Sequence, residues 1–171
     1  MSTNASRGLR IIDTAAPADT TPRVVFCSHC ARTPEGGLAP EVGSRVCTRC
    51  NLGLLLEAPA ELAPKTTEAF VVVDRSLAVH ALSKRAEKLL GLRELDAIDR
   101  RITDLLVPAD AEAQGAHVLS ALLVEAAAGV DDVTHAVVRP ADEFGVRFAA
   151  RVGPCGWGGS ASGALVVLDL G

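Results

Sequence analysis

Apolar and polar positions are patterned most regularly from residue 65 onward. Residues 68–74, EAFVVVD, are a short β-branched run between charged residues and predict a buried strand. Residues 77–83, LAVHALS, predict a second strand that leads into a helix. Ser83 is a suitable N-cap for this helix, because its hydroxyl can accept a hydrogen bond from a backbone amide of the first turn, and Gly91 is a suitable end, because it lacks a Cβ.

Helical spacing dominates the next part of the chain. The segment LRELDAIDRRITDLLVPAD, residues 92–110, predicts short helical pieces that end at Pro108. Residues 111–128 predict a longer, alanine-rich helix with an apolar face that includes Leu119 and Leu123.

The final third of the chain predicts strands. Residues 132–140 alternate weakly and residues 144–152 alternate strongly, with Phe144 on the apolar side. The glycine-rich stretch GPCGWGGSASG, residues 153–163, predicts a loop before a last strand at 164–170. Two strands, several helices and three further strands in this order predict an α+β fold, with one antiparallel sheet and its helices on one side.

Two segments lack a pattern of buried positions. Residues 1–22, MSTNASRGLRIIDTAAPADTTP, predict a flexible tail, and residues 57–65, EAPAELAPK, predict a short linker rich in Ala and Pro. No apolar core of a secretion signal and no apolar run of roughly 18 residues is present. A soluble, cytoplasmic protein that does not contact a membrane is therefore expected.

Composition narrows the classes of function. Ala, Val and Leu supply most apolar residues, whereas there is one Trp and no Tyr, so a ligand pocket lined by bulky aromatic side chains is not expected. The net charge of −4 argues against a broad basic surface for nucleic acid.

Four of the five cysteines form two CxxC pairs, in VFCSHC and VCTRC. They are Cys27, Cys30, Cys47 and Cys50. This spacing is typical of zinc sites, because each turn directs two thiolates at one ion and two turns complete a tetrahedron. The intervening segment is rich in Gly and Pro and is too small for a core, so bound Zn²⁺ would stabilise its fold by about 10 kcal/mol.

Other uses of these cysteines fit less well. Disulfides require an oxidising compartment, for which no secretion signal is present. A thioredoxin-like motif requires a CxxC at the start of a helix, and an iron–sulfur centre suits other spacings. His29, inside the first pair, is expected to face solvent rather than to replace a cysteine.

Residues 23–56 resemble a zinc ribbon. With four cysteines no coordination position is open to water, which implies a structural site. Ribbons often contact nucleic acid or other proteins, and four arginines (Arg23, Arg32, Arg45, Arg49) are present. Only Phe26 is available there for base stacking, so a protein partner and a nucleic acid both stay open.

Residues 66–171 resemble a PAS domain. The resemblance is carried by EAFVVVDRSLAVHALSKRAEKLLGLR, where the family has two strands and an asparagine-x-x-alanine-x-x-x-x-glycine helix. Ser83 stands in the place of the asparagine, while Ala86 and Gly91 match. ITDLLVPAD is similar to the family's leucine-proline-x-aspartate step, with Val107 in place of the leucine. The resemblance implies sensing of a small molecule, redox state or light, or homodimerisation and docking.

Two cofactors of such domains require particular residues. Flavin photochemistry requires a cysteine in a specific helix, whereas Cys155 lies in the predicted loop. A haem would require a proximal histidine on the long helix, where His117 has similar spacing but falls opposite the apolar face. No nucleophile–base grouping or phosphate loop indicates an enzyme.

The sequence therefore predicts a non-enzymatic signal-sensing or transcription-regulating protein. Its PAS domain would form a homodimer and sense a small ligand, and its structural zinc ribbon would dock a partner protein or nucleic acid. Two alternatives stay open: a haem-based gas or redox sensor with His117 as ligand, and a ligand-free scaffold whose ribbon caps the PAS sheet.

Overall fold

The computed structural model describes residues 21–34, 45–111, 115, 117–158 and 160–169. Its strands are β1 (Arg23–Cys27), β2 (Leu55–Pro59), β3 (Ala69–Asp74), β4 (Val79–Leu82), β5 (Leu106–Pro108), β6 (Thr134–Pro140), β7 (Phe148–Trp157) and β8 (Ser160–Asp169). Its helices are α1 (Lys84–Leu90), α2 (Glu94–Ala97), the 3-10 turn η1 (Ile102–Asp104) and α4 (His117–Ala127). Apart from Thr21 and Pro22, the tail expected at 1–22 lies outside the described residues.

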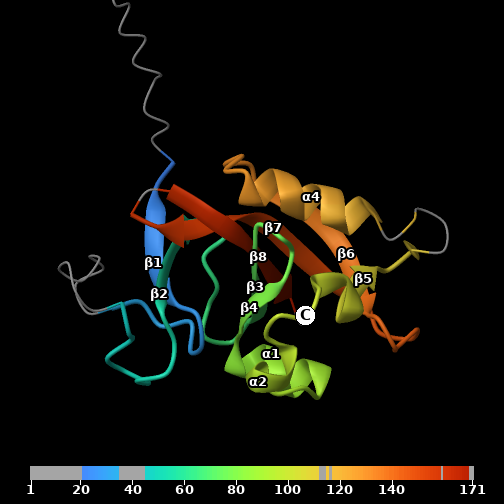
Figure 1. The fold of residues 1–171 in the computed structure, drawn as a ribbon, viewed down its shortest axis with the longest axis horizontal. Helices are drawn as coiled ribbons and strands as arrows, with labels where there is room; N and C mark the ends of the chain where they lie inside the picture. The colour runs from blue at the N-terminus through green and yellow to red at the C-terminus, as the bar shows by residue number, and fades with distance from the viewer. Residues whose placement is uncertain (1–20, 35–44, 112–114, 116, 159, 170–171) are drawn as a thin grey trace, which may run out of the picture.

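The strands form one antiparallel sheet. Its order is β1-β2-β7-β8-β3-β4, and β6 pairs with both β5 and β7. Figure 1 shows β1 and β2 at one end of the molecule and α4 lying across the long β7 and β8 strands. The predicted α+β class, with a single antiparallel sheet, is confirmed.

One face of the sheet packs against the helices. Val71 and Val73 of β3 and Val166 of β8 are buried in the same cluster as Ala86 of α1 and Leu119 of α4. The helix caps follow the sequence prediction. Ser83 accepts a hydrogen bond from the Ala86 backbone, and Gly91 adopts φ 61°, a left-handed value that favours glycine.

The opposite face of the sheet is covered by the N-terminal strands. Phe26 of β1 and Leu56 of β2 are buried against Phe70 of β3 and Val167 of β8. The rings of Phe26 and Phe70 meet edge to face, with centroids 5.7 Å apart and planes at 84°. Because both faces of β3 are covered, its sequence is continuously apolar instead of alternating.

We call residues 23–34 and 45–59 the cysteine hairpin. The linker expected at residues 57–65 does not separate it from the sheet, because β1 pairs with β2 along its whole length and Glu57 continues the pairing to Gly156 of β7. Leu62, three residues after β2, is fully buried in the core cluster of the sheet's opposite face.

The final hairpin also differs from the prediction. The strand expected at 144–152 begins at Phe148, and the loop expected at 153–163 forms the paired ends of β7 and β8. Glycines occur here because a Cβ at Gly156 would collide with the Ser160 carbonyl of the neighbouring strand. Phe144 lies in the preceding turn, 75% exposed.

Candidate metal centre

Two similar turns bring the four cysteines together. The first turn follows β1 and holds Cys27 and Cys30; the second follows an isolated bridge between Val46 and Leu54. The residue after each pair, Ala31 and Asn51, has a positive φ, 61° and 54°, which reverses the chain around the cysteines.

The spacing of the sulfur atoms fits a tetrahedral metal. The Sγ atoms of Cys27 and Cys50 are 3.6 Å apart, those of Cys30 and Cys47 are 4.0 Å apart, and all four lie within 4.8 Å of one another. Metal–sulfur bonds of about 2.3 Å in a tetrahedron place sulfurs about 3.8 Å apart. The four cysteines could therefore bind one metal ion, and none of them is in a disulfide.

The backbone also accommodates thiolates. The amides of His29 and Cys30 donate to Cys27 Sγ at 3.4 and 3.5 Å. Gly53 lies against the centre so closely that a Cβ there would come within 2.7 Å of the His29 amide nitrogen and would also crowd Cys27 Sγ. A glycine at residue 53 is thus required by the site itself.

The thiols differ in acidity. Burial raises the pKa values of Cys27 and Cys30 above that of an ordinary thiol. Burial acts in the same direction on Cys50, but the Gly53 and Leu52 amides and neighbouring thiols outweigh it and lower the pKa to about 7. Cys50 is therefore the first of these three ligands to be available as a thiolate.

Trp157, at the end of β7, connects the centre to the main sheet. The apolar cluster around the cysteines contains Val25 and Leu55, and Trp157 packs against it. The Arg45 guanidinium lies over the indole ring, 4.9 Å from its centroid. The sequence placed Trp157 in a loop, so its role as an anchor of the cysteine hairpin depends on the extended β7 strand.

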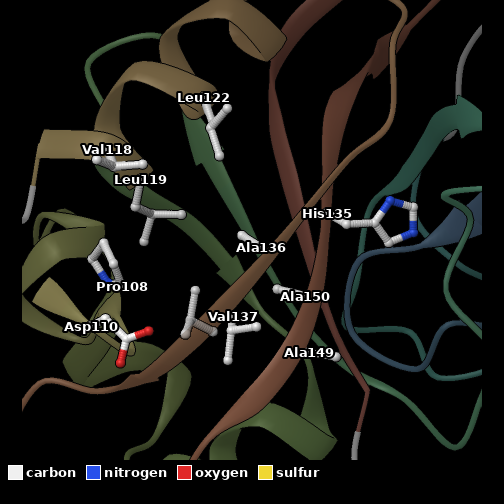
Figure 2. A pocket seen from close by; sticks show the side chains of 11 residues that line it. Pro108, Asp110, Val118, Leu119, Leu122, His135, Ala136, Val137, Ala149 and Ala150 are labelled. Atoms are coloured by element: carbon white, nitrogen blue, oxygen red, sulfur yellow. The ribbon is translucent and has the colours of Figure 1, made fainter. Parts of the chain in front are cut away.

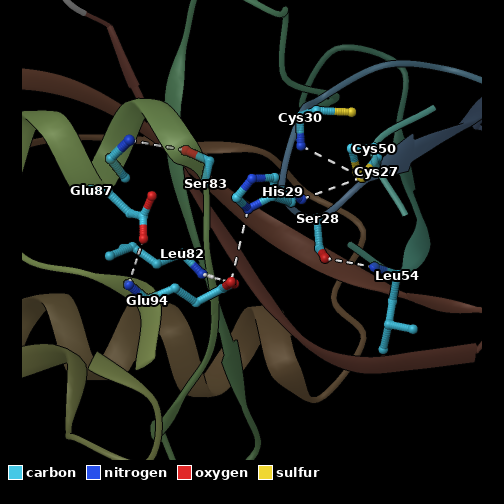
Figure 3. Close-up of polar contacts among 11 residues, drawn as sticks. Cys27, Ser28, His29, Cys30, Cys50, Leu54, Leu82, Ser83, Glu87 and Glu94 are labelled. Carbon is cyan, nitrogen blue, oxygen red and sulfur yellow. Dashed lines mark hydrogen bonds and ion pairs between the residues drawn. The ribbon is translucent and has the colours of Figure 1, made fainter. Parts of the chain in front are cut away.

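His29 connects the first cysteine turn to the helices (Figure 3). Its side chain is 13% exposed, contrary to the expectation that it faces solvent, and Nδ1 lies 3.8 Å from Glu94 Oε2. Glu94 Oε1 accepts from the Leu82 amide at 3.0 Å, and the Lys84 amide donates to the His29 carbonyl at 3.1 Å. We call this junction of residues 29–32 with α1 and α2 the turn–helix seam.

The arginines of the cysteine hairpin are not arranged as a common phosphate-binding surface. Arg23 pairs with Asp131 at 3.1 Å, and Arg45 is stacked on Trp157. Arg32 and Arg49 are exposed.

A separate apolar cavity of about 420 Å³ lies between α4 and β6. Figure 2 shows Val118, Leu119 and Leu122 of α4 facing it, with His135 pointing away from these side chains. Asp110 also lines the cavity and pairs with Arg147 at 3.0 Å. The lining therefore suits a small, mainly apolar molecule.

The remaining candidate residues lie elsewhere. His117 is exposed at the start of α4 and does not line the cavity, so the structure does not bring it to a haem-sized site among the described residues. Cys155 is in β7 instead of a loop, and burial raises the pKa of its thiol to about 12. Within the described part of the chain, no helix is long and apolar enough to cross a membrane.

Comparisons with known proteins give structural similarities alone. No protein-family profile matches the chain, and no curated protein matches it. A PAS domain from Colwellia psychrerythraea is 24% identical, covers 60% of this chain and 85% of its own length, and has a TM-score of 0.43. The PAS domain of histidine kinase ThkA is 20% identical over 60% of this chain and 98% of its own, with a TM-score of 0.39.

A third solved structure is the PAS domain of nitrogen regulation protein NR(II) from Vibrio parahaemolyticus. It is 16% identical, covers 65% of this chain and 95% of its own, and has a TM-score of 0.43. Identities below 25% and TM-scores below 0.5 do not establish that this chain belongs to the PAS family.

Proposed function

We propose that this chain is a non-enzymatic, cytoplasmic sensor or regulator. Its PAS-type domain binds a small apolar ligand in the cavity between α4 and β6, and the cysteine hairpin holds one structural Zn²⁺. The domain forms a homodimer, and the hairpin contributes a surface for a partner protein. The sensing role is supported by the apolar cavity. Two ionisable residues line it, but Asp110 is paired with Arg147 and the His135 side chain points away from the α4 side chains, so the space suits an apolar ligand.

Zinc is favoured by the chemistry of the donor set. Four thiolates in a tetrahedron suit Zn²⁺, which has no preferred geometry of its own, and they leave no position for a reactive water. Bound zinc would fix the two cysteine turns and would supply no catalytic step. Cys27, Cys30, Cys47 and Cys50 are the residues that would hold it.

Metal analysis and an absorption spectrum of the protein purified without a tag test the cofactor. We expect about one zinc per chain and no Soret band. Another metal, or no metal, would contradict the zinc assignment. A Soret band that is lost in His117→Ala would contradict the whole proposal and make the protein a haem sensor.

Ligand binding is tested with indole as an apolar probe, followed by NMR of the methyl groups. We expect shifts at Val118, Leu119 and Leu122, and we expect Leu122→Trp to abolish those at Val118 and Leu119 by filling the cavity. Val124→Trp is the control, because Val124 is on the same helix and 53% exposed outside the cavity lining. Indole shifts that are absent, or that persist in Leu122→Trp, would contradict the ligand site.

A further inference from the structure

A second cavity lies at the turn–helix seam. It has a volume of about 300 Å³, and residues from both the cysteine hairpin and α1 line it. The hydrogen bond from the Lys84 amide to the His29 carbonyl, 3.1 Å long, joins these two walls. The cavity is therefore a product of how the hairpin docks on the sheet domain, and neither wall forms it alone.

Positive charge is concentrated in this cavity. Four cationic side chains line it: Arg32, Lys84, Arg85 and Lys88. The carboxylate in the lining, Glu68, is paired with Arg151 at 2.8 Å. None of the four cations has an ion pair with another residue that the structure describes. In a chain whose net charge is −4, such a cluster in a concave site focuses a positive field.

A metal bound by the four cysteines would balance part of this positive charge. Cys30 also lines the cavity, and a divalent metal on four thiolates would carry a net charge of about −2. The four cations exceed that charge by about two. A small dianion would balance the excess.

We propose that the cavity at the turn–helix seam binds a small multivalent oxyanion, such as a phosphate monoester or a diphosphate. Guanidinium and ammonium groups together suit phosphate oxygens, and the cavity has the size of a small-molecule site. Two lining residues carry a ring: Phe70 is fully buried, and the side chain of His29 is 13% exposed and lies beside Glu94, so neither offers an open face for stacking a base. This feature favours a small oxyanion over a polynucleotide.

Such a ligand would stabilise the docked arrangement. Arg32 belongs to the cysteine hairpin and Lys88 to the last turn of α1, so an anion between them links the two walls. This site goes beyond the proposed function, because neither the zinc centre nor the apolar cavity accounts for it.

The experiment is calorimetric titration of the zinc-loaded full chain with inorganic pyrophosphate at low ionic strength. We expect saturable binding that is weakened at least about tenfold in the double variant Arg32→Ala/Lys88→Ala. Lys65→Ala is the matched control, because Lys65 is exposed and does not line the cavity, and we expect its affinity to be unchanged. Zinc content and indole binding are measured on every sample, so failure of the proposed function is recognised separately.

Three results would overturn the inference. No binding of pyrophosphate is the first, and equal binding by the double variant is the second. Equal binding together with loss of zinc from the double variant would show that these cations stabilise the tetrathiolate and do not bind a ligand. The third is tighter binding of a single-stranded oligonucleotide than of pyrophosphate, weakened by the same substitutions, which would assign the site to nucleic acid.

Discussion

Gly53 has no space for a side chain beside the four clustered cysteines. Its missing Cβ would overlap both the first cysteine turn and Cys27 Sγ. We expect Gly53→Ala to displace this turn and to reduce zinc affinity about tenfold to a hundredfold, as changes beside metal ligands do. Competition with a chromophoric chelator measures the affinity.

Gly145 provides the control for this substitution. A Cβ at Gly145 meets nothing within 4 Å, so Gly145→Ala isolates the general effect of replacing a glycine. Unchanged zinc affinity in Gly53→Ala would show that the turn can move without loss of the metal site.

His29 and Gly53 show which site residues the sequence signals. The CxxC spacing identifies the four cysteines because local turns alone place each pair. His29 had the same sequence context as a solvent-exposed turn residue. Its contact with Glu94 depends on α2, which begins 65 positions later in the chain, and no local pattern encodes that approach.

At the scale of elements, the turn between β3 and β4 is organised by Asp74. Its carboxylate accepts from the Ser76 hydroxyl and from the amides of Ser76 and Ala78, at 2.7 to 3.0 Å. Burial alone would raise its pKa, but these hydrogen bonds outweigh burial and lower it. Since the folded-state pKa is lowered, the stabilisation is present above the unfolded-state pKa of about 4 and is lost as the pH falls through the folded-state value.

We expect Asp74→Ala to lower the free energy of unfolding by about 1 kcal/mol at neutral pH, given that the turn is partly exposed. The difference from the unmodified protein should shrink as the solution is acidified below about pH 4. Denaturant unfolding at a series of pH values measures it, with the exposed Asp142→Ala as control. A difference that does not vary with pH would mean that the charge of Asp74 does not contribute.

The turn–helix seam couples two elements through His29. We expect His29→Ala to retain zinc but to accelerate amide exchange in α1 and α2 several-fold, since contacts worth about 1 kcal/mol are lost. Thr48→Ala, an exposed position in the second cysteine turn, should leave this exchange unchanged. Unaltered exchange in both variants would mean that the backbone bond from Lys84 holds the seam without the imidazole.

Elements with local signals were predicted well. α1 begins and ends at Ser83 and Gly91 because both capping interactions involve neighbouring residues. The ends of β7 and β8 were missed because glycine and serine usually indicate a loop. Here Gly156 and Gly163 permit close approach of Ser160 and Val73 backbone atoms, which are contacts between strands.

At the scale of the whole molecule, the cysteine hairpin and the sheet share a core. Phe26, Leu56 and Leu62 pack on the face of the sheet opposite the helices. Removal of the metal should therefore disturb more than the two cysteine turns, as the scaffold alternative also requires.

The fluorescence of Trp157 can follow the effect of metal removal, because Trp157 is the one tryptophan and the chain has no tyrosine. We expect a zinc chelator to shift Trp157 emission to the red and, over the same concentrations, to reduce amide protection in β3 and β8. Adding zinc in excess should reverse both changes. A red shift with full protection of β3 and β8 would show instead that the hairpin and the sheet fold independently.

The sequence by itself determined the features that depend on neighbouring residues. These are the four-cysteine donor set, the capped α1 helix, the buried β3 strand and the α+β class. Each of these features is signalled by sequence patterns only a few positions long, or by the order of such patterns along the chain.

Only the tertiary structure decided how the parts meet. In it, residues 57–59 of the expected linker belong to strand β2, the expected loop forms the ends of β7 and β8, and the histidine expected to be exposed contacts Glu94. The tertiary structure also formed the apolar cavity beside α4 and the basic cavity at the seam. Apart from the β7–β8 hairpin, whose ends pair residues near one another in the chain, these features depend on contacts between distant residues, whose free energy depends on burial and hydrogen bonding in the assembled fold.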